Sequence, residues 1–460
     1  MPISTTVQEP AIHSLPPVPR NPLPRRRQIE AVRNFHTGPE VLRDAGGPVT
    51  RLELAPRWLM PPVVVATSPR GIRDILGRPG TVVDKTVLHA EMRHLLGNNL
   101  FDLEHDDWLP RRRAVQSVFT KKRVAEFGSH MAQAAETISG GWSDRAEIDL
   151  DGQCRRLTLR ALGRSVLGVG LDEKADSIAA PIEIALSYLA NRTASPIRPP
   201  RWLPTPARRR ARAAGAVLRE LAASIVQACR EDPSHDAALV RAMMDAVDPN
   251  TGAPLSDHEI ADDLVAFMIA GHDTTATTLA YALWQLGRHP ELQDKVMAEA
   301  VAVGDCGSLG PADVAQLGYT VAVLREALRL CPPAPATSRV ALHDMAIDGH
   351  RVDAGTMLLV GIYAVQRDPA LWDDPLTFDP DRFADGAATR HNRWQYLPFG
   401  AGQRSCIGDH FAMLEATLAL ATIVRDIEIT SLATRFPVEV PFTMVAAGPV
   451  GARVRRRRNA

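Results

Sequence analysis

The chain has 460 residues, of which 45% are hydrophobic and 23% are charged, an ordinary globular composition with ample apolar material for a large core. Its 53 Lys and Arg residues balance its 53 Asp and Glu residues, so no global field favours nucleic acid or an anionic membrane. The five cysteines are widely spaced without a Cys-x-x-Cys pair, which argues against a disulfide framework, a zinc ribbon or an iron–sulfur cluster and favours a reducing compartment.

Residues 1–24 are predicted to form an extended, proline-rich arm ahead of a single domain at residues 25–460. Five prolines between Pro16 and Pro24 disfavour helix there. The arm has no apolar core, so we expect neither a secretory signal nor a transmembrane anchor. From Val49 to Thr67 the pattern is β-like and predicts a small sheet near the N-terminus.

A predicted helix between Asp102 and Phe119 carries acidic residues, then Trp108 and a run of arginines. Trp108 and Arg112 lie four residues apart, so on a helix they share one face and can point at the same partner. Taken alone, this pattern indicates an exposed basic turn with a partly buried tryptophan.

The segment from Asn191 to Arg212 contains five prolines, together with Trp202 and several arginines. Prolines exclude a helix interior, so the segment is predicted to be a surface loop between two helices. A stiff connector with a solvated basic face is the simpler interpretation. Contact with RNA or lipid headgroups is an alternative that only this one cluster supports.

The longest helical pattern runs from Ser256 to Arg288, with Ser256 and Glu259 predicted to form a capping box. Much of it is apolar enough to resemble a membrane span. The polar run His272–Thr275 in its middle would be costly in lipid, so we expect a buried central helix.

Inside this helix, the Thr274 hydroxyl can bond the carbonyl of Ala270 and bend the helix. Gly271 removes a side chain at the same place. Together they would open a groove beside Asp273 that could hold a small diatomic ligand and a water. The simpler alternative is a core helix that bonds its few polar groups internally.

A further predicted helix, from Asp313 to Leu330, holds Glu326 and Arg329 three residues apart. Such pairs are usually exposed and contribute only about 0.2–0.5 kcal/mol to stability.

β-like segments follow from Ala346 to Ile362, broken by turn signals. The chain ends in short strand-like runs and a basic stretch, Arg455–Arg458, that we expect to be a solvated tail.

A glycine-rich loop from Tyr396 to Gly408 places Cys406 just before a helical pattern. Gly400 and Gly402 allow a tight, left-handed backbone path. The helix dipole and the nearby Arg404 should favour the thiolate of Cys406, which could then bind a metal. A buried free cysteine in a glycine turn is the alternative.

The run Phe399-Gly400-x-Gly402-x-Arg404-x-Cys406-x-Gly408 resembles, at every fixed position, the heme-binding signature of the cytochrome P-450 monooxygenases. The Trp-x-x-x-Arg, Ala-Gly-His-Asp-Thr-Thr, Glu-x-x-Arg and Phe-x-Pro-x-Arg-Phe motifs precede it in the order of the family. The resemblance implies the cytochrome P-450 fold, a mainly α structure with a smaller β-rich region (α+β) in a single large domain.

The resemblance also implies roles for particular residues. Cys406 would be the axial ligand of the iron in heme b (iron protoporphyrin IX), within the loop of Phe399 and Gly400. Asp273 and Thr274 would deliver protons during oxygen activation. The residues that would hold the heme propionates are Trp108, Arg112, Arg339 and Arg404, with His105 a weaker candidate because its spacing does not match the family. Glu326, Arg329 and Arg382 would form a buried structural ion network, whose disruption would cost roughly 3–5 kcal/mol.

The function predicted from this resemblance is a heme-thiolate monooxygenase that inserts one oxygen atom of O2 into a lipophilic small molecule. We expect a cytoplasmic monomer that binds no nucleic acid. No redox module fits after Cys406, so electrons would come from a ferredoxin and a ferredoxin reductase. A basic face of Arg111–Arg113 and Lys121–Lys122 could dock an acidic donor.

Two alternatives remain at this point. The same fold could serve a peroxygenase, an isomerase or a heme sensor, although Asp273 and Thr274 speak against this. A nucleotide-binding enzyme is a second alternative, since Gly400 and Gly402 half-match a dinucleotide loop, but Ser405 stands where the third glycine belongs and no βαβ pattern surrounds the loop. The substrate stays open among fatty acids, terpenoids, steroids and polyketides.

Overall fold

The computed structural model of the chain describes residues 12–58, 60–85, 87–167, 175–194, 200, 202–235, 237–303, 307–384 and 391–457. The chain divides into two compact units. The β-rich unit consists of Met1–Thr86, Ala336–Trp372 and Asn392–Ser405, and the helical unit of Val87–Pro335, Asp373–His391 and Cys406–Ala460. The predicted mainly α fold with a smaller β-rich region is confirmed.

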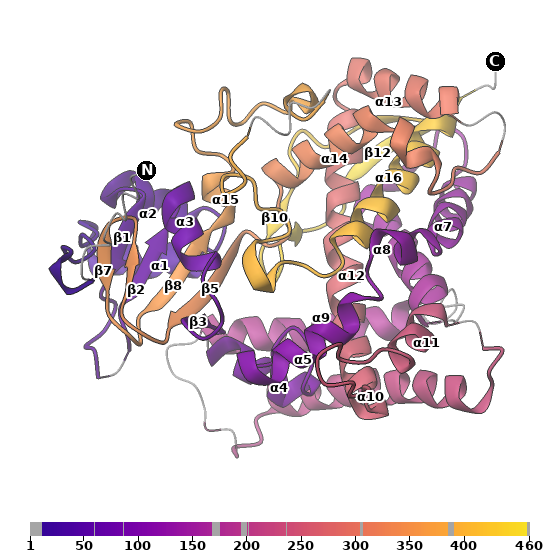
Figure 1. The fold of residues 1–460 in the computed structure, drawn as a ribbon. Helices are drawn as coiled ribbons and strands as arrows, with labels where there is room; N and C mark the ends of the chain where they lie inside the picture. The colour runs from indigo at the N-terminus through magenta and orange to yellow at the C-terminus, as the bar shows by residue number, and fades with distance from the viewer. Residues whose placement is uncertain are drawn as a thin grey trace, which may run out of the picture. The chain divides into compact units, whose positions relative to one another are not determined.

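The β-rich unit is built on a five-stranded sheet with the order β1-β2-β8-β5-β3 (Figure 1). The predicted strands between residues 49 and 67 are present, and every residue of the valine-rich β2 is buried. β2 pairs in parallel with β8 and antiparallel with β1. The strands are β1 (Val49–Leu52), β2 (Val63–Ala66), β3 (Val83–Asp84), β5 (Ala336–Ala341), β6 (Met345–Ile347), β7 (His350–Val352) and β8 (Met357–Gly361), and the helices are α1 (Arg25–Arg33), α2 (Gly38–Gly46), α3 (Pro69–Leu76) and α15 (Ile362–Val365).

The described residues before α1 lie along this sheet. Val18 is buried in the core of the unit. The backbone N–H of Arg51 donates to the carbonyl of Pro19, and that of Arg351 donates to Pro16, both at 2.8 Å. The extended conformation expected for the proline-rich segment therefore serves to line the sheet, while residues 1–11 lie outside the described part of the chain.

The helical unit is organised around α12 (Asp257–Leu286), which packs against α8, α10, α14 and α16. Its second half is buried on every side, from Thr275 to Leu286, as predicted for a central helix. The predicted capping box is present: Ser256 Oγ accepts from the Glu259 N–H at 3.3 Å, and Glu259 Oε2 accepts from the Ser256 N–H at 2.8 Å. Among the residues described, no helix is long and apolar enough to cross a membrane.

The remaining elements of the helical unit surround α12 or form small sheets (Figure 1). They are α4 (Val87–Leu96), α5 (His105–Gln116), α6 (Lys121–Ala125), α7 (Gly128–Gly140), β4 (Glu147–Asp149), α8 (Leu150–Leu162), α9 (Ala175–Ala194), α10 (Pro206–Glu231), α11 (Ala238–Met244), α13 (Pro290–Val303), α14 (Gly318–Leu330), α16 (Asp409–Asp426), β9 (Ile427–Ser431), β10 (Val438–Glu439), β11 (Val445–Ala446) and β12 (Gly451–Arg456).

The loop between α9 and α10 is shorter than the sequence predicted. Helix α9 continues through Ala194, and α10 already starts at Pro206. Proline is well tolerated at the first helical position because its missing N–H would have no partner there. Thr205 caps the helix by accepting from the N–H of Arg208 at 3.2 Å. Residues 195–199 and 201 lie outside the described part of the chain.

The predicted arginine tail is part of a strand as far as Arg456, although the side chains of Arg455 and Arg456 are exposed to solvent as expected. β12 is the central strand of the sheet β4-β12-β9. Arg453 donates to Glu147 at 2.7 Å, and Arg455 pairs with Glu428 on β9. Cross-strand pairs of opposite charge stabilise a sheet, and a single sequence does not reveal which strands will be neighbours. Arg458 lies outside the described residues.

Candidate active site

The loop before α16 has the backbone path that its glycines predicted. Gly400 and Gly402 have φ angles of 68° and 74°. A Cβ on Gly402 would lie 1.8 Å from the carbonyl oxygen of Leu76, whereas a Cβ on Gly400 would meet nothing within 4 Å. Gly402 is therefore needed for close packing of the loop on α3, and Gly400 for its left-handed turn.

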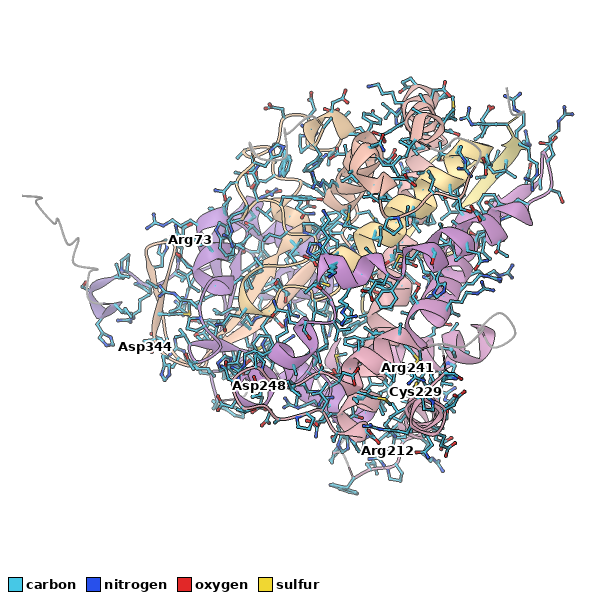
Figure 2. All side chains as sticks on the ribbon, turned by 45° about the vertical axis from the view of Figure 1, so that its right-hand side comes forward. Arg73, Arg212, Cys229, Arg241, Asp248 and Asp344 are labelled. Carbon is cyan, nitrogen blue, oxygen red and sulfur yellow. The ribbon has the colours of Figure 1, made fainter. Side chains whose placement is uncertain are left out.

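Cys406 differs from the other described cysteines. Cys154, Cys229 and Cys331 are buried free thiols, and Cys229 is labelled in Figure 2. Cys406 is also free, but its side chain is exposed. Cys306 lies outside the described residues. The alternative of a buried structural cysteine in a glycine turn is therefore wrong for Cys406.

The surroundings of Cys406 do not produce the easily ionised thiol that the sequence suggested. Although the Cys406 side chain is exposed, the protein packed around it partly desolvates the thiolate and raises its pKa. Asp409 raises this pKa further, while the N–H of Gly408 and the charge of Arg112 lower it. Arg404 was expected to favour the thiolate, but its guanidinium pairs instead with Asp84 at 2.9 Å. Arg112 is thus the cation that acts on this sulfur. A coordinated metal ion deprotonates a thiol outright, so a raised pKa is compatible with metal binding.

Helix α5 carries Trp108 and Arg112, as predicted. Trp108 is buried, and the ring centroid of His105 lies 6.1 Å from that of Trp108. Burial lowers the pKa of Arg112, while Cys406 and Asp409 raise it. In the part of the chain that the structure describes, the guanidinium of Arg112 has no hydrogen bond and no ion pair. An anionic group beside Arg112 would offset the free energy that burial of its unpaired charge costs, so Arg112 suits a carboxylate ligand.

The two other predicted propionate partners lie in the β-rich unit. Arg339 is buried on β5 and donates to Ser338 O at 2.8 Å and to Thr337 Oγ1 at 3.1 Å. Burial and the charge of Arg404 lower the pKa of Arg339 to about 10, and Asp84 offsets part of this effect. Two guanidinium groups thus repel each other beside one carboxylate, and a further carboxylate here would be stabilised.

The division of the chain separates the predicted site residues into two groups. Arg339, Phe399, Gly400 and Arg404 belong to the β-rich unit, and Trp108, Arg112 and Cys406 to the helical unit. The boundary falls between Ser405 and Cys406, inside the loop itself. Each group contains arginines, and a thiol and guanidinium groups are the types of donor that suit an iron porphyrin with carboxylate arms.

The middle of α12 has the local geometry that the sequence suggested. Thr274 Oγ1 donates to the carbonyl of Ala270 at 2.7 Å, one turn earlier. Asp273 pairs with Arg155 of α8, and Arg155 also donates to Asp151 at 2.7 Å. No motif in the sequence singles out this arginine. The spacing of Asp151 and Arg155, four residues apart on one helix, was the only available signal.

His272 lies buried beside this ion pair. Its Nδ1 is 3.3 Å from Thr158 Oγ1, which also donates to the His272 carbonyl at 3.1 Å. Its Nε2 is 3.7 Å from Asp273 Oδ1. Burial lowers the pKa of His272. The side chain that precedes Asp273 is thus a packed, hydrogen-bonded group that fixes the orientation of α12 against α8.

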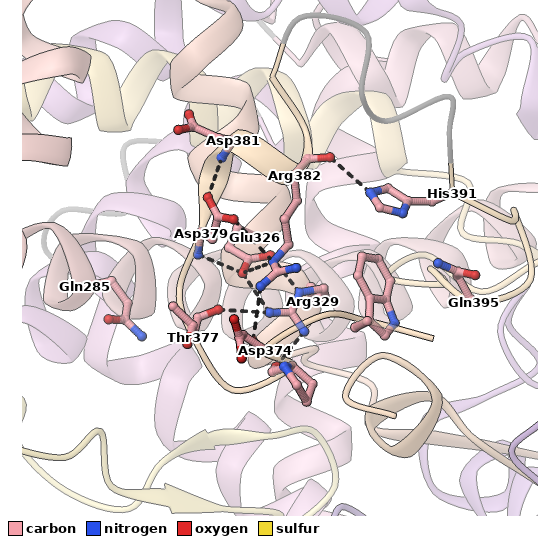
Figure 3. A network of polar contacts seen from close by, with 12 residues as sticks. Gln285, Glu326, Arg329, Asp374, Thr377, Asp379, Asp381, Arg382, His391 and Gln395 are labelled. Atoms are coloured by element: carbon pink, nitrogen blue, oxygen red, sulfur yellow. Dashed lines mark hydrogen bonds and ion pairs between the residues drawn. The ribbon is translucent and has the colours of Figure 1, made fainter. Parts of the chain in front are cut away.

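Glu326, Arg329 and Arg382 meet in one network (Figure 3). Arg329 donates two hydrogen bonds of 2.7 Å to the Glu326 carboxylate, and Arg382 Nε lies 3.6 Å from it. The side chains of Glu326 and Arg329 are 0% exposed. Arg329 also donates to the carbonyls of Pro375 and Thr377 at 2.8 and 3.2 Å. The pair therefore ties α14 to the segment that follows Asp373.

Part of the predicted docking face is not available to a partner. Arg111 is buried and pairs with Asp263 at 2.8 Å. Arg113 pairs with Asp248 at 2.8 Å. The expectation that Arg111–Arg113 form an exposed basic face is wrong, because helix α5 turns these side chains toward acids of distant segments. Lys121 and Lys122 on α6 are exposed, as expected.

Comparison with known proteins identifies the family. The family model for cytochrome P450 matches residues 16–452. The chain belongs to the cytochrome P450 family. It is 34% identical to a cyclooctat-9-en-7-ol 5-monooxygenase of Streptomyces melanosporofaciens. This match extends over 360 residues and covers 78% of each chain. It is 30% identical over 369 residues to a pentalenene oxygenase of Streptomyces avermitilis, over 80% of this chain and 81% of the other.

Solved structures support the same conclusion. This P450 superposes on the heme domain of a cytochrome P450DA mutant with a TM-score of 0.83 and 26% sequence identity, over 96% of this chain and 98% of that chain. The family binds heme, and P450 monooxygenases use a redox partner and a small-molecule substrate. The protein is a heme-thiolate monooxygenase, and the nucleotide-binding alternative is wrong because the family match spans its glycine loop.

Proposed function

We propose that this P450 oxidises a cyclic terpenoid at heme b, with Cys406 as the axial iron ligand. The observation that carries the cofactor assignment is the exposed thiol of Cys406 beside Arg112, whose guanidinium has no partner among the described side chains. The substrate class rests on relatives named for cyclooctat-9-en-7-ol and pentalenene. Of the four lipophilic classes compatible with the sequence, terpenoids fit these names best.

When bound, the heme supplies the oxygen-activating chemistry, and electron donation from a thiolate favours O–O cleavage. Arg112 and Trp108 would hold one propionate, and Arg339 and Arg404 the other, through charge-assisted hydrogen bonds. Asp84 pairs with Arg404 at 2.9 Å. Phe399 and Gly400 would shape the loop that presents the sulfur, and Gly400 leaves space on its open side.

Proton delivery is assigned to Asp273 and Thr274. The Asp273 carboxylate pairs with Arg155, and it would accept a proton from water and pass it on. The Thr274 hydroxyl donates to Ala270 O and keeps its lone pairs free to accept a hydrogen bond from a substrate or water. Arg155 would act as a positioning residue, because it fixes the Asp273 side chain against α8.

Substituting Asp273→Asn is expected to lower the rate of substrate oxidation by about 10²- to 10⁴-fold, since an amide cannot relay a proton. Thr274→Ala should mainly lower the yield of product per electron consumed. Turnover, electron consumption and the solvent isotope effect would be measured with a ferredoxin donor. Asp151→Asn is the matched control, because it removes the other carboxylate partner of Arg155 and should change turnover little.

If Asp273→Asn and Thr274→Ala both form product at the unmodified rate with that donor, the proton-relay assignment is wrong. The peroxygenase, isomerase or sensor alternative would then be favoured. Electron supply from a ferredoxin and its reductase is itself part of the proposal. Lys121 and Lys122 are the exposed cations from the predicted docking face that can meet an acidic donor.

A titration with a panel of lipophilic compounds tests the substrate class. Cyclic terpene hydrocarbons and terpene alcohols are expected to shift the heme absorption spectrum with dissociation constants at least about tenfold below those of fatty acids and steroids, a difference of about 1.4 kcal/mol. Tighter binding of a fatty acid or a steroid than of every terpenoid would show that the terpenoid assignment is wrong.

A further inference from the structure

The β-rich unit contains a cavity of about 300 Å³ that has no part in the proposed chemistry. Residues of the segment before α1, of β1 and β2 with their connection, and of β7 with the turn after it line this cavity (Figure 1). None of the lining residues is a predicted heme contact. Val18, Val64 and Val352, which are 2%, 1% and 2% exposed, form an apolar part of the lining. Such a surface suits the organic part of a small ligand.

Three arginines line the same cavity, which we therefore call the arginine cavity. They are Arg51 on β1, Arg57 in the connection to β2, and Arg351 on β7. Within the part of the chain that the structure describes, their guanidinium groups form no hydrogen bond, and the Nε atoms of Arg51 and Arg351 are buried without a partner. A guanidinium carries five N–H donors, and leaving buried donors unpaired costs free energy. The arginine cavity thus has unused donors for an acceptor that enters it.

The carboxylate nearest to Arg51 is already bound to another arginine. Glu53 Oε1 lies 3.6 Å from Arg51 Nη2, which is too far for a hydrogen bond. Glu53 Oε2 accepts a hydrogen bond from Arg20 Nη2 at 2.6 Å. One carboxylate therefore serves two guanidinium groups, and the closer contact is with Arg20.

The other two arginines of the cavity share a single carboxylate in the same way. Asp353 lies 3.3 Å from Arg351 Nε and 3.8 Å from Arg57 Nη2. Together with the pairs of Glu53, this makes four arginines and two carboxylates, a net charge of +2. The whole chain has no net charge, so this local excess is a property of the cavity. A dianion would neutralise it.

Backbone hydrogen bonds fix the positions of two of these arginines. The N–H of Arg51 donates to Pro19 O at 2.8 Å, and Arg51 O accepts from the N–H of Asn21 at 2.9 Å. The N–H of Arg351 donates to Pro16 O at 2.8 Å. The segment before α1 thus holds both strands, and binding an anion would need little ordering of the backbone.

We propose that the arginine cavity binds the phosphate group of a small, soluble organic phosphate, with the organic part of the ligand against the three valines. A phosphate monoester carries about −1.5 to −2 charges at pH 7 and three acceptor oxygens, which match the net charge and the three guanidinium groups. The planar donor fork of arginine fits phosphate geometry. A carboxylate carries one charge and two oxygens, so it matches less well. Inorganic phosphate would leave the apolar surface uncovered.

Calorimetric titration of the full-length, heme-loaded enzyme with phenyl phosphate tests the proposal. We expect saturable binding of one molecule, with a dissociation constant at least about tenfold below those of benzoate and of inorganic phosphate, because each of these lacks part of the match. High salt should weaken the binding. The heme absorption spectrum should not change, since no predicted heme contact lines the arginine cavity.

Variants of the lining residues give opposite expected effects. Arg51→Gln and Arg351→Gln should each weaken the binding of phenyl phosphate at least about tenfold, because each removes a charge-assisted hydrogen bond. Asp353→Asn should tighten it about threefold, because the competing carboxylate is removed. A purely structural role for these ion pairs predicts no tightening. Arg26→Gln is the matched control, since Arg26 is an exposed arginine of the same unit, 3.2 Å from Glu30, and its loss should change binding less than about twofold.

Four outcomes would overturn the proposal. The first is the absence of saturable binding of phenyl phosphate, and the second is an equal loss in Arg51→Gln and Arg26→Gln. The third is tighter binding of benzoate than of phenyl phosphate. The fourth is binding to vesicles of phosphatidic acid without binding of the soluble compound, which would assign the arginines to a lipid headgroup. If Arg51→Gln does not fold, the direction of the change in Asp353→Asn decides, and weaker binding there contradicts the proposal.

Discussion

Replacing Cys406 with serine is expected to abolish the red-shifted Soret band of the reduced, carbon monoxide-bound enzyme and to reduce monooxygenase turnover to background. A hydroxyl is a weaker electron donor than a thiolate and does not favour O–O cleavage in the same way. Heme content, the carbon monoxide difference spectrum and product formation would be measured on the same preparation. Residual heme binding through the arginine contacts is compatible with this result.

Cys229→Ala is the matched control for this substitution. Cys229 is also a free thiol of the helical unit, but it is buried on α10, and burial raises its pKa. Its removal should leave the Soret band and turnover unchanged. If Cys406→Ser keeps the thiolate-type spectrum, or if Cys229→Ala loses it, the assignment of the axial ligand is wrong.

Substituting Glu326→Gln is expected to lower the free energy of unfolding by roughly 3–5 kcal/mol. The change removes the carboxylate charge that pairs with Arg329 and lies beside Arg382, and the Arg329 guanidinium is fully buried. The carbonyls of Pro375 and Thr377 would still accept hydrogen bonds from Arg329, but a carbonyl does not neutralise a charge. The midpoint of urea unfolding would report the loss.

The exposed pair of Arg123 and Glu126 offers a matched control with the same three-residue spacing, at 3.4 Å. Glu126→Gln should change the free energy of unfolding by less than about 1 kcal/mol, because water screens this pair. The heme spectrum of folded Glu326→Gln should stay of the thiolate type, since the network does not touch the loop of Cys406. Equal, small losses for both variants would contradict a buried structural role for Glu326.

Several features of the fold and the site were predictable because they depend on local sequence. The capping box of Ser256 and Glu259 involves residues of one turn. The hydrogen bond from Thr274 to Ala270 follows from helix geometry alone. The left-handed turn at Gly400 needs only the absence of a side chain. In each case the interacting atoms lie within a few residues of one another.

Other features depend on contacts between distant segments, and these could not be predicted from one sequence. Arg155 meets Asp273 across 118 residues, and Arg404 meets Asp84 across 320. The expectation that Arg404 would favour the thiolate was wrong for this reason, because the Arg404 guanidinium forms an ion pair with the carboxylate of Asp84. Arg111 was likewise expected on the surface and is instead buried against Asp263.

By itself, the sequence determined the family, because its signature is a local pattern. The fixed positions of this pattern are Phe399, Gly400, Gly402, Arg404, Cys406 and Gly408. The assignment of Cys406 as the heme ligand is a proposal that rests on this resemblance. Only the tertiary structure decided the electrostatics around these residues and the placement of three arginines around one cavity of the β-rich unit. Burial and ion pairing depend on which distant groups fold against a side chain. The spacing of residues along the chain does not reveal which distant groups pack against a given side chain.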